Sequence, residues 1–214
     1  MQRRVQMITM VTVAVFLAVP AAAAEPGWTV RLTGAWVKPG LDLPKVDSDV
    51  PVHVSSQGAL GAGAAIEYRL RPWVGLGVDA LHARPGIVLE ADLPEGRRRV
   101  SESLSFTPFS VGPVFHVTPN RWIDLTLAAT LGFAAYGDLL FAADGERLSL
   151  QGGWAFAWGL GAGVDIYPGA SRWAIHAGVR RFGSTLTFTN IENGAAGSAA
   201  FNPLVVTFGV ACRF

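Results

Sequence analysis

Cysteine, charge and long apolar stretches are all scarce in this chain of 214 residues. Its single cysteine, Cys212, excludes an internal disulfide framework. Charged residues make up only 15 % of the chain and the formal net charge is +1, so the basic patch of a nucleic-acid-binding protein is missing and we expect no nucleic-acid partner. Neither metal-ligand spacing nor a phosphate-binding loop is present, so we expect no metal and no cofactor.

One apolar segment stands out, at the N-terminus. Two arginines precede an uncharged apolar run over residues 7–19, and small residues follow at 22–24. This order is typical of a cleaved secretory signal peptide. A membrane-spanning helix needs roughly 20 apolar residues, whereas this run is shorter and is followed by Pro20. We therefore expect a signal peptide over 1–24 and a single domain over 25–214.

The rest of the composition presents a contradiction. Half of the residues are hydrophobic and the mean hydropathy is +0.35, which is apolar for a soluble domain, yet no further run of about 18 apolar residues exists to form a spanning helix. The 25 glycines also disfavour helices. In lipid every backbone polar group must be bonded internally, so only helices and closed barrels can span the bilayer. The composition therefore favours a transmembrane β-barrel.

Period-2 alternation supports the barrel, because a barrel strand points alternate residues to lipid and to the lumen. In the C-terminal segment one face carries Leu204, Val206, Phe208, Val210, Cys212 and Phe214. The same period recurs over 60–70, 123–133 and 154–166, where the opposite face is small or polar. A soluble β-sandwich is the alternative, but its outward faces would be polar, whereas here the charged residues fall on the inward faces.

Turn-forming residues set the strand count. Tight turns at 71–72, 118–121 and 168–171 alternate with longer polar or Gly/Pro-rich stretches near 39–56, 85–102, 138–148 and 189–200. Short periplasmic turns and long outer loops are typical of outer-membrane barrels. The sequence thus predicts an all-β, eight-stranded, antiparallel up-and-down barrel with strands over 27–38, 57–70, 73–84, 103–117, 122–137, 149–167, 172–188 and 201–214.

Aromatic residues gather near the periplasmic ends of these strands, as expected for an interfacial girdle. They are Trp28, Tyr68, Trp73, Phe115, Trp122, Tyr167, Trp173 and Phe214. Trp73, Trp122 and Tyr167 fall out of phase with the outward faces of their strands. Either a bulge or turn re-aims these three side chains, or they point inward.

Charged residues on the inward faces form a predicted polar network in the lumen. Its members are Arg31, Glu67, Arg69, Asp79, Asp124, Asp165, His176, Arg180 and Arg213. A charge in a narrow lumen must be paired, and acids and bases are comparable in number. We expect a ladder of salt bridges that fills the periplasmic half of the barrel, with an ion path through the lumen as the alternative.

Several segments resemble one family. The strands around Ala65-Ile66-Glu67-Tyr68 and Trp73-Val74-Gly75-Leu76, the segment Gly163-Val164-Asp165-Ile166-Tyr167 before Trp173, and the closing strand to Phe214 are similar to the outer-membrane W (OmpW) family of small eight-stranded barrels. That family lies within the wider OmpA-like and opacity-type group. The resemblance implies location in the Gram-negative outer membrane, reached through the periplasm.

The resemblance also implies a function and partners. Family members are thought to pass small hydrophobic molecules into the membrane, which would require an apolar cleft in the outer half; candidates for its lining are Trp36, Leu60, Trp158 and Phe182. A structural or surface-interaction barrel without transport is the alternative. Terminal Phe214 resembles the signal read by the outer-membrane assembly machinery. We expect a monomer surrounded by outer-membrane lipid and lipopolysaccharide, whose phosphates the basic run at 97–99 could contact.

A lipid-hydrolysing barrel would be a third possibility, and it would need a serine beside a histidine base. His116 and His176 lie near the periplasmic turns, which is the wrong end for a substrate in the outer leaflet. Only His82 is suitably placed, with Ser101, Ser103 and Ser105 across the next loop. We expect no enzymatic activity.

Overall fold

A computed structural model describes residues 27–42, 52–93, 96–118, 122–143, 146–190 and 196–214. The expected signal peptide, 1–24, lies outside the described residues. The described chain is almost entirely β-structure, with a single 3-10 turn at Pro168–Ala170. None of its described helices could cross a membrane.

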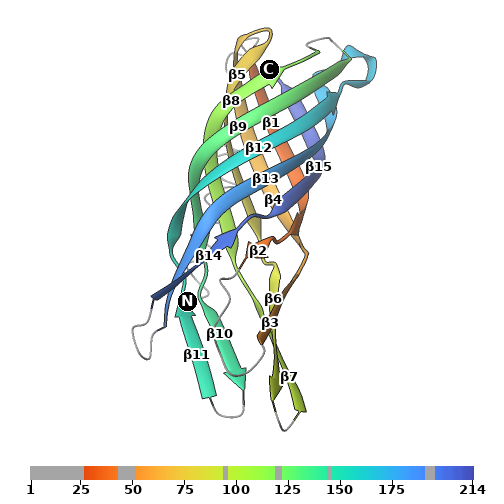
Figure 1. The fold of residues 1–214 in the computed structure, drawn as a ribbon. Coiled ribbons are helices and arrows are strands. Elements are labelled where there is room, and N and C mark those ends of the chain that lie inside the picture. Colours follow the sequence, from red (N-terminus) through yellow and green to blue (C-terminus); the bar gives the residue numbers. More distant parts are fainter. Residues whose placement is uncertain (1–26, 43–51, 94–95, 119–121, 144–145, 191–195) are drawn as a thin grey trace, which may run out of the picture.

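Eight long strands form the barrel (Figure 1). They are β1 (Trp28–Lys38), β4 (Ala59–Arg71), β5 (Val74–Ala83), β8 (Phe106–His116), β9 (Ile123–Tyr136), β12 (Trp154–Ile166), β13 (Trp173–Asn190) and β15 (Leu204–Arg213). Each pairs antiparallel with the next in this order. β1 pairs on its other side with β15, which closes the cylinder. The predicted fold class is confirmed.

The two ends of the barrel differ. At one end, called the turn end here, three short connections join β4 to β5, β8 to β9 and β12 to β13. The beginning and end of the barrel meet there, since the Gly27 N–H donates to the Phe214 carbonyl at 3.1 Å and the Phe214 N–H donates to the Trp28 carbonyl at 2.9 Å. Long connections extend from the opposite loop end. By the general rule for such barrels, the turn end faces the periplasm.

The long connections contain strands that the sequence did not predict. They are β2 (Leu41–Asp42), β3 (Val52–Gln57), β6 (Gly86–Leu93), β7 (Gly96–Ser103), β10 (Leu139–Ala143), β11 (Glu146–Gln151) and β14 (Ala196–Phe201). β3, β6 and β7 form a separate sheet beyond the barrel. The predicted continuous strands over 57–70, 103–117, 149–167 and 201–214 are wrong in this respect, because each spans a break between two strands.

Local chemistry explains the breaks within 149–167 and 201–214. The first falls at Gly152 and Gly153, and a Cβ on Gly152 would lie only 2.3 Å from the Tyr136 carbonyl oxygen. The second falls at Asn202 and Pro203, where proline has no N–H to donate to a ladder. The chain therefore changes course at the rim of the barrel.

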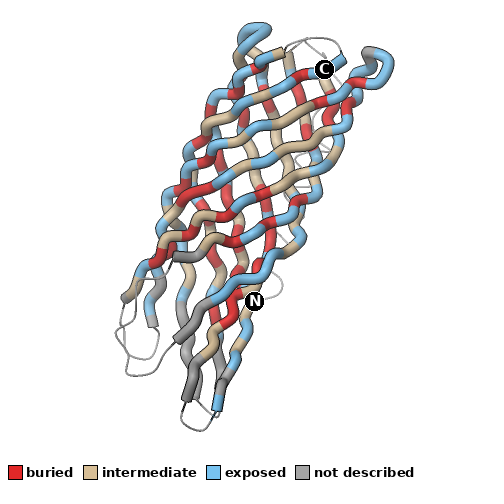
Figure 2. The backbone as a smooth tube through the Cα atoms, turned by 45° about the vertical axis from the view of Figure 1, so that its right-hand side comes forward, coloured by how far each residue is buried: buried red, intermediate tan, exposed pale blue. Residues whose placement is uncertain are grey.

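Buried and exposed residues alternate along the barrel strands, as Figure 2 shows, and large apolar side chains occupy many of the exposed positions. Outward side chains such as Leu60, Leu131 and Phe208 are 83 %, 58 % and 65 % exposed. A soluble sandwich would bury these residues. The exposed apolar band therefore matches a lipid-facing wall.

Two of the three out-of-phase aromatic residues point outward. Trp73 and Trp122 are exposed, and a register shift between Arg69 and Arg71 lies immediately before Trp73. Tyr167 instead is buried in the lumen, with the Arg213 guanidinium 4.0 Å from the centre of its ring. Both alternatives left open by the sequence thus occur.

Candidate functional site

The turn-side half of the lumen is closed by a buried ion-pair network, called the polar floor. It consists of Arg31, Glu67, Arg69, His116, Asp124, Asp165, His176 and Arg213. Arg31 projects from β1 and joins two acids on different strands: its Nη1 lies 2.8 Å from Glu67 and its Nη2 lies 2.7 Å from Asp165. His176 Nδ1 lies 2.7 Å from the other oxygen of Asp165.

His116 is a second centre of the floor, and its side chain is fully buried. Its Nε2 lies 2.6 Å from Glu67 and its Nδ1 lies 2.9 Å from Asp124. Asp124 also binds Arg69, and Arg213 Nη2 lies 3.4 Å away. Because each acid is shared between several basic side chains, the removal of one acid would remove a contact from more than one of them.

Small residues make room for this network. A Cβ on Gly75 would lie 2.8 Å from the Glu67 carboxylate, and a Cβ on Gly163 would lie 3.2 Å from the His176 ring. Both glycines belong to the inward faces of their strands. The alternation of glycine with apolar residues in β5 and β12 therefore supplies the space that the long polar side chains of neighbouring strands occupy.

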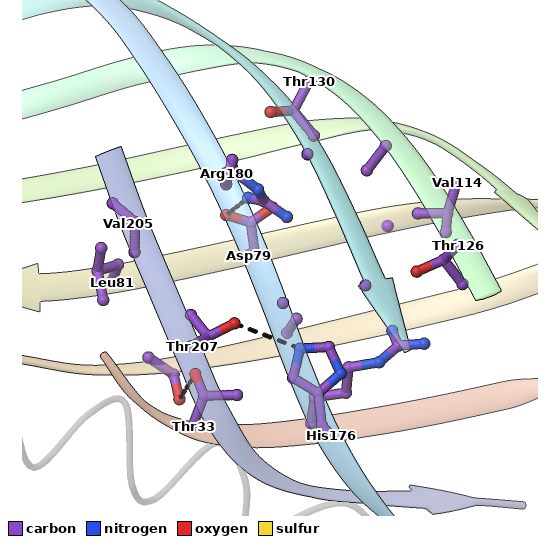
Figure 3. Close-up of a pocket in the computed structure, with 18 of the residues that line it drawn as sticks. Thr33, Asp79, Leu81, Val114, Thr126, Thr130, His176, Arg180, Val205 and Thr207 are labelled. Carbon is purple, nitrogen blue, oxygen red and sulfur yellow. Dashed lines mark hydrogen bonds and ion pairs between the residues drawn. The ribbon is translucent and has the colours of Figure 1, made fainter. Parts of the chain in front are cut away.

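A small cavity lies above the floor (Figure 3). Its volume is about 110 Å³, and the Arg180–Asp79 ion pair, 2.5 Å between Nη1 and Oδ1, crosses it. Ser110 donates to Asp79 at 2.9 Å. The buried Thr130 hydroxyl, which also lines the cavity, has no hydrogen-bond partner among the residues that the structure describes. A polar space of this size suits a few water molecules.

The loop-side half of the lumen is filled by buried apolar side chains, called the apolar cluster. Its larger members are Val37, Leu81, Ile87, Leu104, Phe106, Tyr136, Leu139, Phe182, Leu186, Phe201 and Val205. Phe106 lies at its centre, with ring centroids 5.2 Å from Phe201, 5.7 Å from Tyr136 and 6.1 Å from Phe182. This half of the barrel is thus closed by packing and carries almost no charge.

The wall beside the apolar cluster is interrupted between β12 and β13. These strands are paired from Ile166↔Ile175 only as far as Ala157↔Ser184. β12 continues three residues farther, to Trp154, in register with β9 alone. β13 continues in register with β14 on its other side. On the edge of β13 that faces β12, the next paired residue is Thr189, which pairs with Gln151 of β11.

This interruption, called the seam, forms an open groove. Its lining is Trp154, Ala155, Phe156, Trp158, Gly183, Ser184, Thr185, Thr187, Ala200 and Asn202. Ala155 packs against the apolar cluster. The Tyr136 hydroxyl is hydrogen-bonded to Ser184, which joins β9 to β13 beside the groove. The seam therefore places the lipid-facing surface next to the packed interior of the outer half.

The turn-side edge of the seam is held by an aromatic–glycine pair. Trp158 and Gly183 are partners in register across β12 and β13. A Cβ on Gly183 would lie 2.4 Å from the Trp158 indole, so the ring lies directly on the glycine backbone. The absence of a side chain at this position lets a large ring cover the last paired residues below the seam.

The four residues predicted to line a cleft do not meet at one place. Phe182 is buried in the apolar cluster and Trp158 borders the seam from outside. Trp36 and Leu60 are exposed partners in register on β1 and β4. Two strands, β13 and β15, separate β1 from β12 in the barrel. The structure therefore brings only Trp158 and Phe182 near a common feature, on opposite sides of the wall.

The nine residues predicted for the lumen network all engage in interior contacts, seven in the polar floor and two in the Asp79–Arg180 pair. His116 was not predicted as a member of the network, although it is in phase with the inward residues Ser110 and Val114 of its strand. The contact between Tyr136 and Ser184 was not predicted either, because nothing local in the sequence links β9 to β13.

The histidine considered for catalysis has a different partner. His82 Nδ1 lies 2.8 Å from the Thr107 hydroxyl. Ser101 and Ser103 lie on β7, outside the barrel, and Ser105 uses its carbonyl to accept from the Gly137 N–H. Within the described parts of the chain, no metal-binding group of three or more His, Cys, Asp or Glu residues is present.

Sequence comparison assigns the chain to a family. Residues 9–214 match the family described as outer membrane protein beta-barrel domain. The chain belongs to this outer-membrane β-barrel family. Its location is accordingly the outer membrane, as the sequence predicted. No curated protein matches the sequence significantly.

Solved structures show the same fold at low sequence identity. OprG from Pseudomonas aeruginosa is 10 % identical, with 89 % of this chain and 97 % of that chain covered and a TM-score of 0.62. AlkL, determined in lipid bilayers, is 16 % identical, with coverages of 92 % and 94 % and a TM-score of 0.52. Escherichia coli outer membrane protein W is 16 % identical, with coverages of 89 % and 98 % and a TM-score of 0.51. This chain therefore shares the fold of these outer-membrane barrels.

Proposed function

We propose that this barrel is a narrow passive conduit through which small hydrophobic molecules pass from the outside into the lipid bilayer. The single observation that carries the proposal is the seam between β12 and β13. A molecule that reaches the apolar cluster from the loop end would leave sideways through the groove that Trp154 and Phe156 border, at the outer edge of the apolar band. The proposal includes no chemical step, so the protein acts without enzymatic activity.

The polar floor supports a sideways exit. Transfer of an apolar solute past Arg31, Glu67 and Asp165 would require separation of buried ion pairs, which costs several kcal/mol per ion. Displacement of apolar side chains by an apolar solute carries no such penalty, because both environments are apolar. The outer half is thus the region that such a solute can enter.

A structural or surface-interaction barrel without transport is the second candidate. It is favoured by the packing of the outer lumen, where Phe106 and Phe201 are about 1 % exposed or less. Transport requires these rings to move aside, whereas a structural role does not. The two candidates therefore differ in whether closing the seam has a functional consequence.

A disulfide across the seam tests the proposal. In a C212A background, F156C and T185C place one cysteine on each edge, and L127C with A162C places a matched pair on the fully bonded wall between β9 and β12. Uptake of a fluorescent apolar compound into proteoliposomes is measured before and after oxidation. We expect the seam disulfide, verified by mass spectrometry, to abolish uptake and a reductant to restore it.

The control disulfide should leave uptake unchanged. Uptake that persists in the fully oxidised seam variant would contradict a sideways exit at this position. Uptake in the unmodified protein equal to that of protein-free liposomes would instead favour the structural candidate.

A further inference from the structure

The outer wall carries positive charge on the lipid-facing side. All four acidic residues of the eight barrel strands, Glu67, Asp79, Asp124 and Asp165, point into the lumen. Lys38, Arg71 and Arg181 belong to the same strands and are exposed. Arg71 ends β4 at the turn end, where an interfacial charge is expected. Lys38 and Arg181 lie elsewhere and need a separate explanation.

Lys38 and Arg181 flank one residue of the strand between them. Leu204 of β15 is in register with Lys38 of β1 on one side and with Arg181 of β13 on the other. Their backbones are therefore two strand spacings apart, roughly 10 Å. Side chains of this length can converge on one anion from that separation. Neither cation makes an ion pair with any other residue that the structure describes.

Their depth matches the outer edge of the apolar band. Arg181 follows Trp173 of the turn-side girdle by eight residues and Lys38 follows Trp28 by ten. At about 3.3 Å per residue and a strand tilt of about 40°, these offsets place the two cations roughly 20 and 25 Å above the girdle, against an apolar band about 25 Å tall. The Lys38 backbone thus lies at the outer edge of the apolar band, and the Arg181 backbone lies within its upper part, from where the long arginine side chain reaches the outer-leaflet headgroups.

An apolar row lies immediately below the cations. Trp36, Val206 and Val179 are in register on β1, β15 and β13, two residues from Lys38, Leu204 and Arg181 on the turn side. Trp36 and Val179 are more than 40 % exposed. Cations above and apolar side chains below complement a molecule that has a phosphate at its headgroup and acyl chains beneath it.

We propose that the wall formed by β1, β15 and β13 binds the phosphorylated glycolipid of the outer leaflet, with Lys38 and Arg181 on one phosphate of its lipid A portion and Trp36, Val206 and Val179 against its acyl chains. The site lies on the turn side of the seam residues Thr185, Ala200 and Asn202, and it does not depend on the proposed function. A lipid-facing arginine with apolar neighbours is costly in a barrel, and a bound phosphate offsets that cost.

Native mass spectrometry of the detergent-solubilised protein tests the site. The unmodified chain, a K38Q/R181Q double variant and an R71Q/R172Q double variant are titrated with diphosphoryl lipid A, with the same lipid lacking both phosphates, and with phosphatidylglycerol. The R71Q/R172Q control removes two exposed charges at the turn end. Heat-modifiable migration on gels confirms that each variant is folded.

We expect the unmodified chain to prefer diphosphoryl lipid A over both other lipids. K38Q/R181Q should bind it at least about tenfold more weakly, while R71Q/R172Q binds it as the unmodified chain does. Equal binding of the phosphate-free lipid or of phosphatidylglycerol by the unmodified chain would overturn the proposal, and this readout does not depend on the folding of any variant. Equal affinity of K38Q/R181Q and the unmodified chain would also overturn it.

Discussion

The turn-side half of the lumen is closed by charged side chains that share partners, and the loop-side half is closed by aromatic and aliphatic side chains that pack. In the first half, Glu67 and Asp124 each contact more than one cationic side chain. In the second half, Phe106 contacts three other rings and makes no polar contact through its side chain. The charged side chains of the polar floor resist the entry of apolar solutes, whereas an apolar solute can displace the side chains of the apolar cluster.

The barrel wall is continuous around the polar floor and interrupted beside the apolar cluster. Around the polar floor, β12 and β13 are paired residue by residue from Asp165↔His176 to Gly161↔Arg180. Beside the apolar cluster, the same two strands separate. The half that an apolar molecule can enter is therefore also the half from which it can leave sideways.

The largest expected effect comes from breaking the polar floor. Asp124→Ala removes the shared partner of Arg69, His116 and Arg213, and leaves Arg213 without its acid and Arg69 and the buried His116 with Glu67 alone. We expect the free energy of unfolding to fall by about 3–5 kcal/mol, as measured by urea titration in detergent with tryptophan fluorescence. Glu102→Ala, on β7 outside the barrel, should change it by less than about 0.5 kcal/mol. Equal effects of the two changes would show that the floor contributes no stability.

Opening the apolar closure should affect both stability and uptake. Phe106→Ala removes the central ring of the apolar cluster, and we expect a loss of about 3 kcal/mol in the free energy of unfolding. Because the ring also blocks the outer lumen, uptake of an apolar probe into proteoliposomes should rise. Single-channel ion conductance should stay at the level of the unmodified protein, since the polar floor is intact. A rise in conductance without a rise in uptake would contradict this division between the halves.

Crowding the edge of the seam should have a smaller effect. Gly183→Val places methyl groups where the Trp158 indole lies, so the ring must leave the wall, at a cost of about 1–3 kcal/mol. Tryptophan fluorescence and uptake should both change. A glycine with open space around it, Gly153, provides the control, and Gly153→Ala should leave both unchanged. Unaltered fluorescence in the Gly183→Val variant would show that the ring does not rest on the glycine.

The smallest effect is expected from the hydrogen bond beside the groove. Tyr136→Phe keeps the ring and removes the hydroxyl that binds Ser184, so the free energy of unfolding should fall by about 1 kcal/mol. Uptake should increase slightly, because β9 is no longer tied to β13. Tyr68→Phe, on the outer girdle beside Trp28, is the matched control. A decrease in uptake specific to Tyr136→Phe would show that the hydroxyl assists passage instead of restraining it.

The barrel was predictable because alternation is a local property of each strand. Leu125 and Asp124 show their opposite directions in the sequence itself, and glycines such as Gly75 mark lumen positions. The same phase places Phe182, two residues after Arg180, in the lumen and Trp158 on the outer face. The prediction that these two residues line one cleft was therefore inconsistent with the alternation of the sequence itself.

The seam and the strands of the long connections were not predictable in this way. Both depend on which strands pair at the rim, and pairing joins residues far apart in the chain, such as Gln151 with Thr189. The glycine pair at 152–153 is a local signal for a break in the strand. It does not indicate that β12 loses its β13 partner while it keeps its β9 partner.

Photolabelling in bilayers tests most directly whether apolar molecules enter the outer half and are excluded from the floor. The protein is reconstituted, illuminated with a small apolar diazirine and mapped by mass spectrometry. We predict labels on lipid-facing residues of the whole wall and on the inward residues Ala155, Phe182 and Leu186 behind the seam, with none on Thr126 or other inward residues at the floor. Labels confined to lipid-facing residues, or found equally on inward residues of both halves, would contradict the account.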